Sequence, residues 1–158
     1  MSRREFLGDS EATDRLGTLL AQTLPESSVV FLRGNLGAGK SSLARAMLRA
    51  LGVEGAIKSP TYTLIERYRL ARGEAVHLDL YRIAAAGELD FLGLDDLAAQ
   101  ATLWLIEWPE RGGHALPQAD LHVRLALAGE GREAGLEPES ASGVLWLDQL
   151  VIQPRITG

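Results

Sequence analysis

The eight residues from Gly34 to Ser41 constrain this chain more than any other part of its sequence. They read GNLGAGKS and match the pattern G-x-x-x-x-G-K-[ST] in full. An apolar segment, residues 29–32, precedes them, and an amphipathic segment, residues 41–51, follows and ends at Gly52. A chance match is expected in about one of several hundred chains of this composition. The pattern therefore predicts a phosphate-binding loop between a buried strand and a helix.

The chemistry of such a loop assigns a role to each kind of residue in it. Glycines let main-chain N–H groups approach phosphate oxygens closely, and the following helix points its N-terminus at the same anion. Lys40 is expected to reach the β- and γ-phosphates, and the Ser41 hydroxyl to bind Mg²⁺. The motif Asn-Lys-x-Asp, by which many GTP-binding proteins read guanine, is absent from the sequence, which favours ATP. The expected nucleotide contacts in this segment are Gly34, Leu36, Gly37, Ala38, Gly39, Lys40, Ser41 and Ser42.

Hydrophobic periodicity in the rest of the chain predicts both helices and strands. The expected helices are residues 12–24, 41–51, 84–92 and 95–100, and the expected strands are 29–32, 61–69, 75–81, 102–106, 121–127 and 144–152, the last two around a polar loop at 129–143. This order indicates an α/β fold, a P-loop NTPase-like three-layer sandwich whose mostly parallel central sheet carries antiparallel edge strands. The length of 158 residues predicts a single domain over residues 1–158.

Composition excludes several kinds of protein. The chain has no cysteine, which rules out disulfides, cysteine-ligated zinc or iron–sulfur sites and thiol catalysis. It has no apolar run of the roughly 20 residues that a membrane helix needs. Residues 1–8 lack the apolar core of a secretion signal, so we expect a cytoplasmic protein with no membrane partner. The net charge of −5 gives no general electrostatic reason to bind RNA or DNA directly.

Two acidic residues at the ends of expected strands are candidates for catalysis beside the loop. Glu107 directly follows an apolar strand, at the position where open α/β sheets bind ligands. We expect it to bind Mg²⁺, directly or through water, and to polarise the attacking water; the alternative is an acid that caps a loop. Asp79 lies in HLDLY, where a period of two places it on one face with His77 and Tyr81. It is either close to the core or the site, or a solvent-exposed acid on a strand face.

Three further features have two interpretations each. His77 is either a structural, hydrogen-bonded histidine or a catalytic one, and the scattered histidines of the chain show no zinc-ligand spacing. Residues 58–63, KSPTYT, form either a switch that senses the γ-phosphate or a stiff turn that enters a strand. Trp108 either stacks on a base or a partner, or packs in the core.

Four motifs occur in order and at suitable intervals: GNLGAGKSS, KSPTYTL, HLDLYR and LIEWPE. Together with the N-terminal EATDRLGTLLAQTL, they resemble the bacterial TsaE (YjeE) family, the small ATPase of tRNA threonylcarbamoyladenosine (t6A) biosynthesis. The resemblance covers residues 9–132. The sequence departs from the family pattern at Asn35, where Asp is usual, and at Ser41, where Thr is usual. Ser41 keeps the hydroxyl, whereas Asn35 removes one charge near the γ-phosphate.

This resemblance implies a Mg²⁺-dependent ATPase that is weak alone and docks on the TsaB–TsaD pair. ATP turnover would then support repeated transfer of threonylcarbamoyl to adenosine 37 of tRNAs that read ANN codons, a transfer that this chain would not itself catalyse. An acidic protein can serve tRNA modification when its partners hold the tRNA. We therefore expect contact with tRNA only through TsaB and TsaD.

The resemblance also implies roles for single residues by position. Ser41 and Glu107 look like the magnesium-contacting pair. Asp79 resembles the acid needed for hydrolysis, and Thr61 resembles a switch hydroxyl. The resemblance adds three nucleotide contacts. Asp9 and Ser10 match the stretch near the adenine in the family, and Arg132 resembles a basic residue late in the family sequence that touches the nucleotide. Trp108 is a further candidate contact. The expected catalytic residues are Lys40, Thr61, Asp79 and Glu107.

Two other functions fit a chain with this loop. A small-molecule kinase has a similar size and core, but such enzymes use an arginine-bearing lid, and residues 84–100 hold acids and leucines without an arginine. A non-enzymatic module, whose ATP state only gates the binding of a partner, would keep its function in a Glu107→Ala variant. Transfer of the γ-phosphate to a metabolite would favour the kinase over an ATPase that releases free phosphate.

Overall fold

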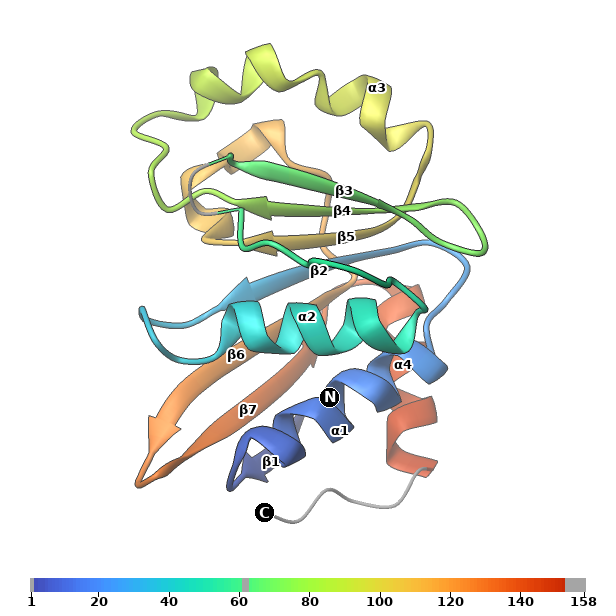
Figure 1. Ribbon diagram of the computed structural model, residues 1–158, viewed down its shortest axis with the longest axis vertical. Helices are drawn as coiled ribbons and strands as arrows, with labels where there is room; N and C mark the ends of the chain where they lie inside the picture. Colours follow the sequence, from blue (N-terminus) through green and yellow to red (C-terminus); the bar gives the residue numbers. More distant parts are fainter. Residues whose placement is uncertain (1, 61–62, 153–158) are drawn as a thin grey trace.

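The computed structural model describes residues 2–60 and 63–152, which form one mixed sheet with flanking helices (Figure 1). The strands are β1 (Arg3–Leu7), β2 (Ser28–Arg33), β3 (Ile65–Arg69), β4 (Glu74–Asp79), β5 (Ala101–Glu107), β6 (Leu121–Ala128) and β7 (Gly131–Pro138). The α-helices are α1 (Ser10–Gln22), α2 (Lys40–Ala50), α3 (Leu94–Ala98) and α4 (Ala141–Ile152), and the 3₁₀ helices are η1 (Ala86–Leu92), η2 (Pro109–Arg111) and η3 (Gly113–Ala115). Within these described residues, every helix is too short or too polar to cross a membrane.

The sheet has the strand order β1-β7-β6-β2-β5-β4-β3. Its four central strands, β6, β2, β5 and β4, run parallel. At one edge β7 and β1 pair antiparallel, and at the other edge β3 pairs antiparallel with β4. This arrangement confirms the predicted α/β fold, with a mostly parallel centre and antiparallel edges.

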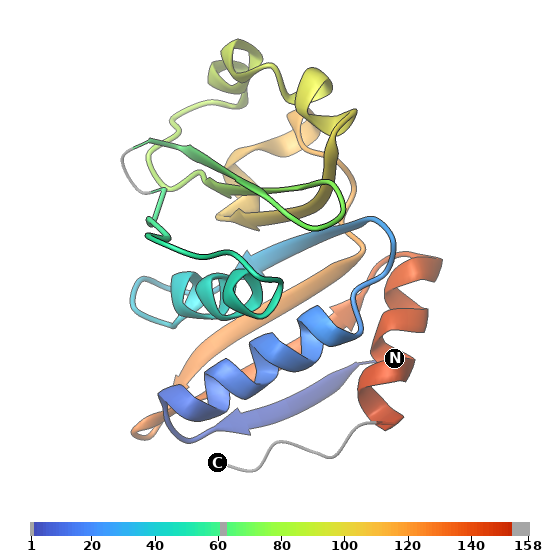
Figure 2. The ribbon, with the colours of Figure 1, turned by 45° about the vertical axis from the view of Figure 1, so that its right-hand side comes forward.

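Different elements bury the two faces of the sheet, because successive side chains of a strand point to opposite faces. On β5, Leu103 and Leu105 pack in one core with residues of α1, α2 and α4. Trp104 and Ile106 of the same strand pack in a second core with residues of η1 and α3. Figures 1 and 2 show α1 and α2 side by side along the first face. The sheet therefore lies between two layers, as the predicted three-layer sandwich requires.

The elements around the glycine-rich loop agree with those expected from the sequence. The apolar segment at 29–32 lies within β2, and the amphipathic segment at 41–51 lies almost entirely within α2. The strands expected at 61–69 and 75–81 correspond to β3 and β4, which pair antiparallel, and the two short helices expected after them are η1 and α3. The single-domain assignment stays a prediction.

The strand predicted at 144–152 is wrong, because these residues belong to helix α4. The segment VLWLDQLVI is apolar except at Asp148 and Gln149, so its composition is compatible with a buried strand. In the structure Trp146, Leu147 and Leu150 are buried, which is the i, i+1, i+4 spacing of a helix face. The indole of Trp146 donates a hydrogen bond to the hydroxyl of Thr23 at 3.0 Å and so ties α4 to the end of α1.

The polar loop predicted at 129–143 is also wrong, because it contains strand β7. Here Ala134 and Leu136 are buried, while Glu133 and Glu137, which flank them, are exposed. Ala134 and Leu136 of β7 therefore point into the core. The alternation is hard to recognise in the sequence, because most other residues of the strand are small or charged. Strand β1 was not predicted from the sequence. It pairs with β7 at the edge of the sheet.

Candidate functional site

The glycine-rich loop connects the carboxyl end of β2 to the first turn of α2. Gly34 and Gly39 have φ angles of 146° and 106°, which residues with a side chain rarely adopt. Gly39 caps the N-terminus of α2, and the main-chain N–H of Ala38 donates to the oxygen of Asn35 at 3.1 Å to close the turn. Helix α2 has 11 residues, and the unpaired main-chain N–H groups of its first turn can bind an anion.

Lys40, the first residue of α2, is buried beside this loop. Its Nζ donates to the main-chain oxygens of Gly34 and, at 3.0 Å, of Asn35. The same nitrogen lies 4.5 Å from the centre of the Trp108 ring. Burial lowers the pKa of Lys40, and the nearby carboxylates of Glu107 and Asp79 partly oppose this shift. The ammonium is thus held at the mouth of the loop.

Ser41 and Glu107, which are 66 residues apart in sequence, are in direct contact. The Ser41 hydroxyl lies 3.0 Å from Oε2 and 3.2 Å from Oε1 of Glu107. Glu107 ends β5 and follows Leu103 and Leu105 on the face of the sheet that α2 covers. Only 3% of Glu107 is exposed, so its carboxylate is withdrawn from solvent.

Asp79 ends β4 and is paired in register with Glu107 on β5. It is 6% exposed, so it is not a solvent-exposed acid on a strand face. One of its oxygens accepts a hydrogen bond from the main-chain N–H of Tyr81 at 3.0 Å. The parallel pairing of β4 and β5 thus brings two carboxylates to the same edge of the sheet, next to Lys40.

Trp108 follows Glu107 and has a left-handed backbone, with φ of 57°. A non-glycine residue in this region stores strain of about 1–3 kcal/mol, which is common at functional sites. The half-buried ring lies against Tyr81, with ring centres 5.0 Å apart, and partly covers the second core. Trp108 therefore packs on the core with one part and faces Lys40 with another.

Two adjoining cavities surround the loop. The smaller, about 290 Å³, is lined by Lys40, Ser41, Asp79, Glu107 and Trp108, among others. The larger, about 830 Å³, runs between α1, α2 and β7, and its lining includes Asp9, Ser10 and Thr13. Gly39, Ser42 and Arg132 line both cavities, so the two lie next to each other.

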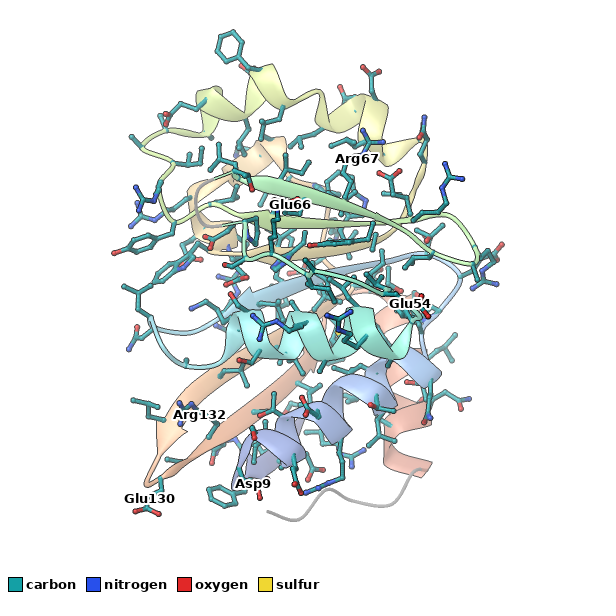
Figure 3. The ribbon with its side chains drawn as sticks, in the orientation of Figure 1. Asp9, Glu54, Glu66, Arg67, Glu130 and Arg132 are labelled. Carbon is teal, nitrogen blue, oxygen red and sulfur yellow. The ribbon has the colours of Figure 1, made fainter. Side chains whose placement is uncertain are left out.

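Arg132 of β7 fixes the outer side of the loop. Its Nε donates to the oxygen of Ala38 and its Nη2 to the oxygen of Gly37, each at 3.2 Å. Asp9 lies across the larger cavity, where its carboxylate caps α1 by accepting from Ala12 at 2.9 Å. Figure 3 shows Asp9 and Arg132 at the same end of the molecule, where α1 begins and the β6–β7 hairpin lies.

The remaining predicted residues are placed as follows. Gly34 starts the loop, Leu36 and Gly37 line the smaller cavity, and buried Ala38 accepts from Arg132. Thr61 lies outside the described residues. Sequence reasoning did not single out Tyr81 as a lining residue, although its position two residues after Asp79 was a signal for it.

The donor atoms fit a hard divalent cation. Ser41 offers a hydroxyl and Glu107 a carboxylate, which are oxygen ligands of the kind that Mg²⁺ prefers. In the described part of the chain, no group of three His, Asp or Glu side chains could hold a metal ion by itself. The protein would therefore supply one or two ligands, and phosphate and water the others, which is the usual situation for Mg²⁺ at nucleotide sites.

Comparison with known proteins places this chain in a family. A family model described as "Threonylcarbamoyl adenosine biosynthesis protein TsaE" matches residues 7–134. The chain belongs to the TsaE family. It is 37% identical over 147 residues to the tRNA threonylcarbamoyladenosine biosynthesis protein TsaE of Haemophilus influenzae, in an alignment that covers 90% of this chain and 93% of that protein. The TsaE protein of Synechocystis is 42% identical over 117 residues, with 72% and 71% covered.

A solved structure carries the same fold. The crystal structure of YdiB from Bacillus subtilis superposes with a TM-score of 0.80 and covers 96% of this chain and 95% of its own. The sequence identity is 24%, so this likeness supports the fold alone. The family match confirms the TsaE resemblance drawn from the four motifs and places the chain in a family of tRNA threonylcarbamoyladenosine biosynthesis.

Proposed function

We propose that this TsaE-family chain is a Mg²⁺-dependent ATPase that acts with TsaB and TsaD in threonylcarbamoyl modification of adenosine 37 in tRNAs that read ANN codons. The observation that carries the proposal is the contact between Ser41 and Glu107 at 3.0 Å, with Asp79 paired in register beside it. A loop that only bound phosphate would not require two buried carboxylates at its mouth. Hydrolysis requires both a place for the metal and an oriented water.

The two cavities suggest how ATP would lie. The triphosphate would occupy the smaller cavity, where main-chain amides of residues 36–42 and the N-terminus of α2 stabilise its charge. The adenosine would occupy the larger cavity beside Asp9 and Ser10. Arg132, which lines both cavities, would hold the loop and add one positive charge near the phosphates.

The residues around the γ-phosphate would divide the work of hydrolysis. Lys40 would exchange its main-chain partners, Gly34 and Asn35, for phosphate oxygens. Ser41 and Glu107 would hold Mg²⁺, whose charge, when it is bound, neutralises the phosphates and favours departure of the leaving group. Asp79 would orient the attacking water and accept its proton, since it is the second buried carboxylate of the smaller cavity.

The proposed partners follow from the family and agree with the charge. A chain of net charge −5 has little electrostatic attraction for tRNA, so TsaB and TsaD would hold the substrate. We expect weak intrinsic binding of tRNA. Filter binding at physiological salt tests this point, and a submicromolar affinity of the chain alone would contradict it.

The decisive experiment measures phosphate release by the purified chain with and without TsaB–TsaD. We expect slow hydrolysis alone and stimulation by the pair. Asp79→Asn and Glu107→Gln should lower turnover at least about 100-fold while ATP still binds, and Lys40→Ala should weaken ATP binding itself. Glu110→Gln, which alters an exposed carboxylate near the site, is the matched control and should behave like the unmodified chain.

Each alternative function predicts a different result in this experiment. Transfer of labelled γ-phosphate to a metabolite would identify a kinase. Full support of tRNA modification by Glu107→Gln without hydrolysis would identify a nucleotide-gated binding module. The absence of heat when Mg·ATP is titrated into the folded chain would overturn nucleotide binding, and with it the whole proposal.

A further inference from the structure

A buried histidine lies directly behind the proposed metal ligand. His77 of β4 is 2% exposed, and its Nε2 lies 2.7 Å from Oε2 of Glu107. In the register of β4 and β5, His77 is opposite Leu105, two residues before the pair of Asp79 and Glu107. His77 is not among the described residues that line the two cavities, so its side chain contacts the site only through Glu107.

The hydrogen bonds around His77 determine which nitrogen carries the proton. Nδ1 is buried and has no hydrogen-bond partner among the described residues. A proton on Nδ1 would leave a buried donor without an acceptor, which is costly. A proton on Nε2 is donated to the carboxylate of Glu107, which accepts it. The contacts therefore favour a proton on Nε2.

Glu107 is in turn held from two sides. Its Oε2 accepts from His77 and from Ser41, and its Oε1 accepts from Ser41 at the longer distance of 3.2 Å. The terminal torsion of a glutamate is broad, so one hydrogen bond does not fix the plane of the carboxylate. The bond from His77 approaches from the interior of the sheet and the bond from Ser41 from α2. Together they fix the orientation of both oxygens.

We propose that His77 is a positioning residue that orients the Glu107 carboxylate for the metal. This inference rests on the proposed function, because Glu107 is there a ligand of Mg²⁺, directly or through water. Residues behind metal ligands fix ligand orientation, and their removal commonly costs about 10- to 100-fold in metal affinity or activity. A purely structural histidine would only fill space between β4 and its neighbours.

Three substitutions separate these two roles. In His77→Gln, the amide nitrogen takes nearly the position of Nε2 and can still donate to Glu107. In His77→Asn, the amide nitrogen takes the position of Nδ1 and falls short of Glu107. His77→Leu keeps the volume without a donor. If His77 only fills space, the Gln and Asn variants should bind Mg²⁺ equally well. If His77 positions Glu107, only the Gln variant should keep most of the Mg²⁺ affinity.

The first measurement is the affinity for ADP with Mg²⁺ and with EDTA, by calorimetry. We expect all variants to bind ADP in EDTA within about twofold of the unmodified chain. In His77→Leu and His77→Asn, Mg²⁺ should bind to the nucleotide complex about 10- to 100-fold more weakly, and His77→Gln should recover most of this loss. Equal Mg²⁺ dependence in all variants, or an equal loss in Gln and Asn, would overturn the inference.

The second measurement needs no nucleotide and no metal. In ¹⁵N-histidine-labelled protein, NMR should show a proton on Nε2 of His77, and Glu107→Ala should shift that signal. A proton on Nδ1, or a signal that ignores Glu107→Ala, would overturn the contact itself. If the unmodified chain bound no Mg·ATP while this signature was present, the proposed function would fail and the His77–Glu107 contact would stand.

Discussion

Gly34 is the residue where a single added methyl group should do most damage to both fold and site. Its φ is 146°, and a Cβ atom built there would overlap the main-chain oxygen of Leu125 on β6. This neighbour belongs to the backbone of a central parallel strand, so it cannot rotate away as a side chain can. A side chain at position 34 therefore forces β2 and β6 apart at the point where the loop begins.

The structure gives the size of this effect for Gly34→Ala. The backbone strain of a residue with a side chain in such a conformation is about 1–3 kcal/mol. Displacing packed neighbours adds about 1–3 kcal/mol. A chain of this length loses about 2–4 °C in Tm for each kcal/mol, so we expect a fall of about 5–20 °C. ATP affinity should fall as well, since the loop would enter at a different angle.

Gly52→Ala is the matched control for this substitution. Gly52 has a φ of 97°, but no heavy atom lies within 4 Å of a Cβ built there. The control therefore carries the backbone strain without the overlap and should lower Tm by only about 2–10 °C. Thermal unfolding followed by circular dichroism measures both. Equal losses in the two variants, or an unchanged Tm in Gly34→Ala, would refute the reasoning.

Three further substitutions test other contacts. Arg132→Ala should weaken ATP binding about 5- to 30-fold in calorimetry, because the loop oxygens lose two donors, while Arg124→Ala, on the exposed side of β6, should not. Gly17→Ala should lower Tm, since its Cβ would lie 2.5 Å from that of Ala46 where α1 crosses α2, and the added change Ala46→Gly should restore it. Burial raises the pKa of the Tyr68 phenol, so the folded chain keeps a proton that the unfolded chain loses as pH rises through about 10. Urea unfolding at pH 9 and 11 should therefore show a smaller loss of stability for Tyr68→Phe; an equal loss would contradict it.

The part of the fold that the sequence predicted well is specified by local signals. The β2–loop–α2 unit is an apolar strand, three glycines and an amphipathic helix in direct succession, and no distant partner is needed to recognise it. The segment that became α4 is different. Its residues are apolar on nearly every side, so periodicity does not decide between strand and helix. Packing against β7 and the hydrogen bond to Thr23, which is 123 residues away in sequence, decide it.

The candidate site divides in the same way. Ser41 and Glu107 could be proposed separately, one from a motif and the other from its place at a strand end. Their contact depends on the parallel pairing of β2 with β5, which no local pattern specifies. The role of His77 depends further on the register of β4 against β5, since a shift of one residue would turn its side chain to the other face. Its two interpretations could therefore not be separated from the sequence.

The error at β7 has a consequence for Arg132. In an irregular loop, nothing would determine whether Arg132 or its neighbour Glu133 faces the glycine-rich loop. In a strand, side chains alternate, and Ala134 and Leu136 are buried in the core beneath α1 and α2. Arg132 shares their face and reaches the oxygens of the loop, whereas Glu133 points to the opposite face. Pairing with β6 and β1 thus places the cation, and not the carboxylate, against the glycine-rich loop.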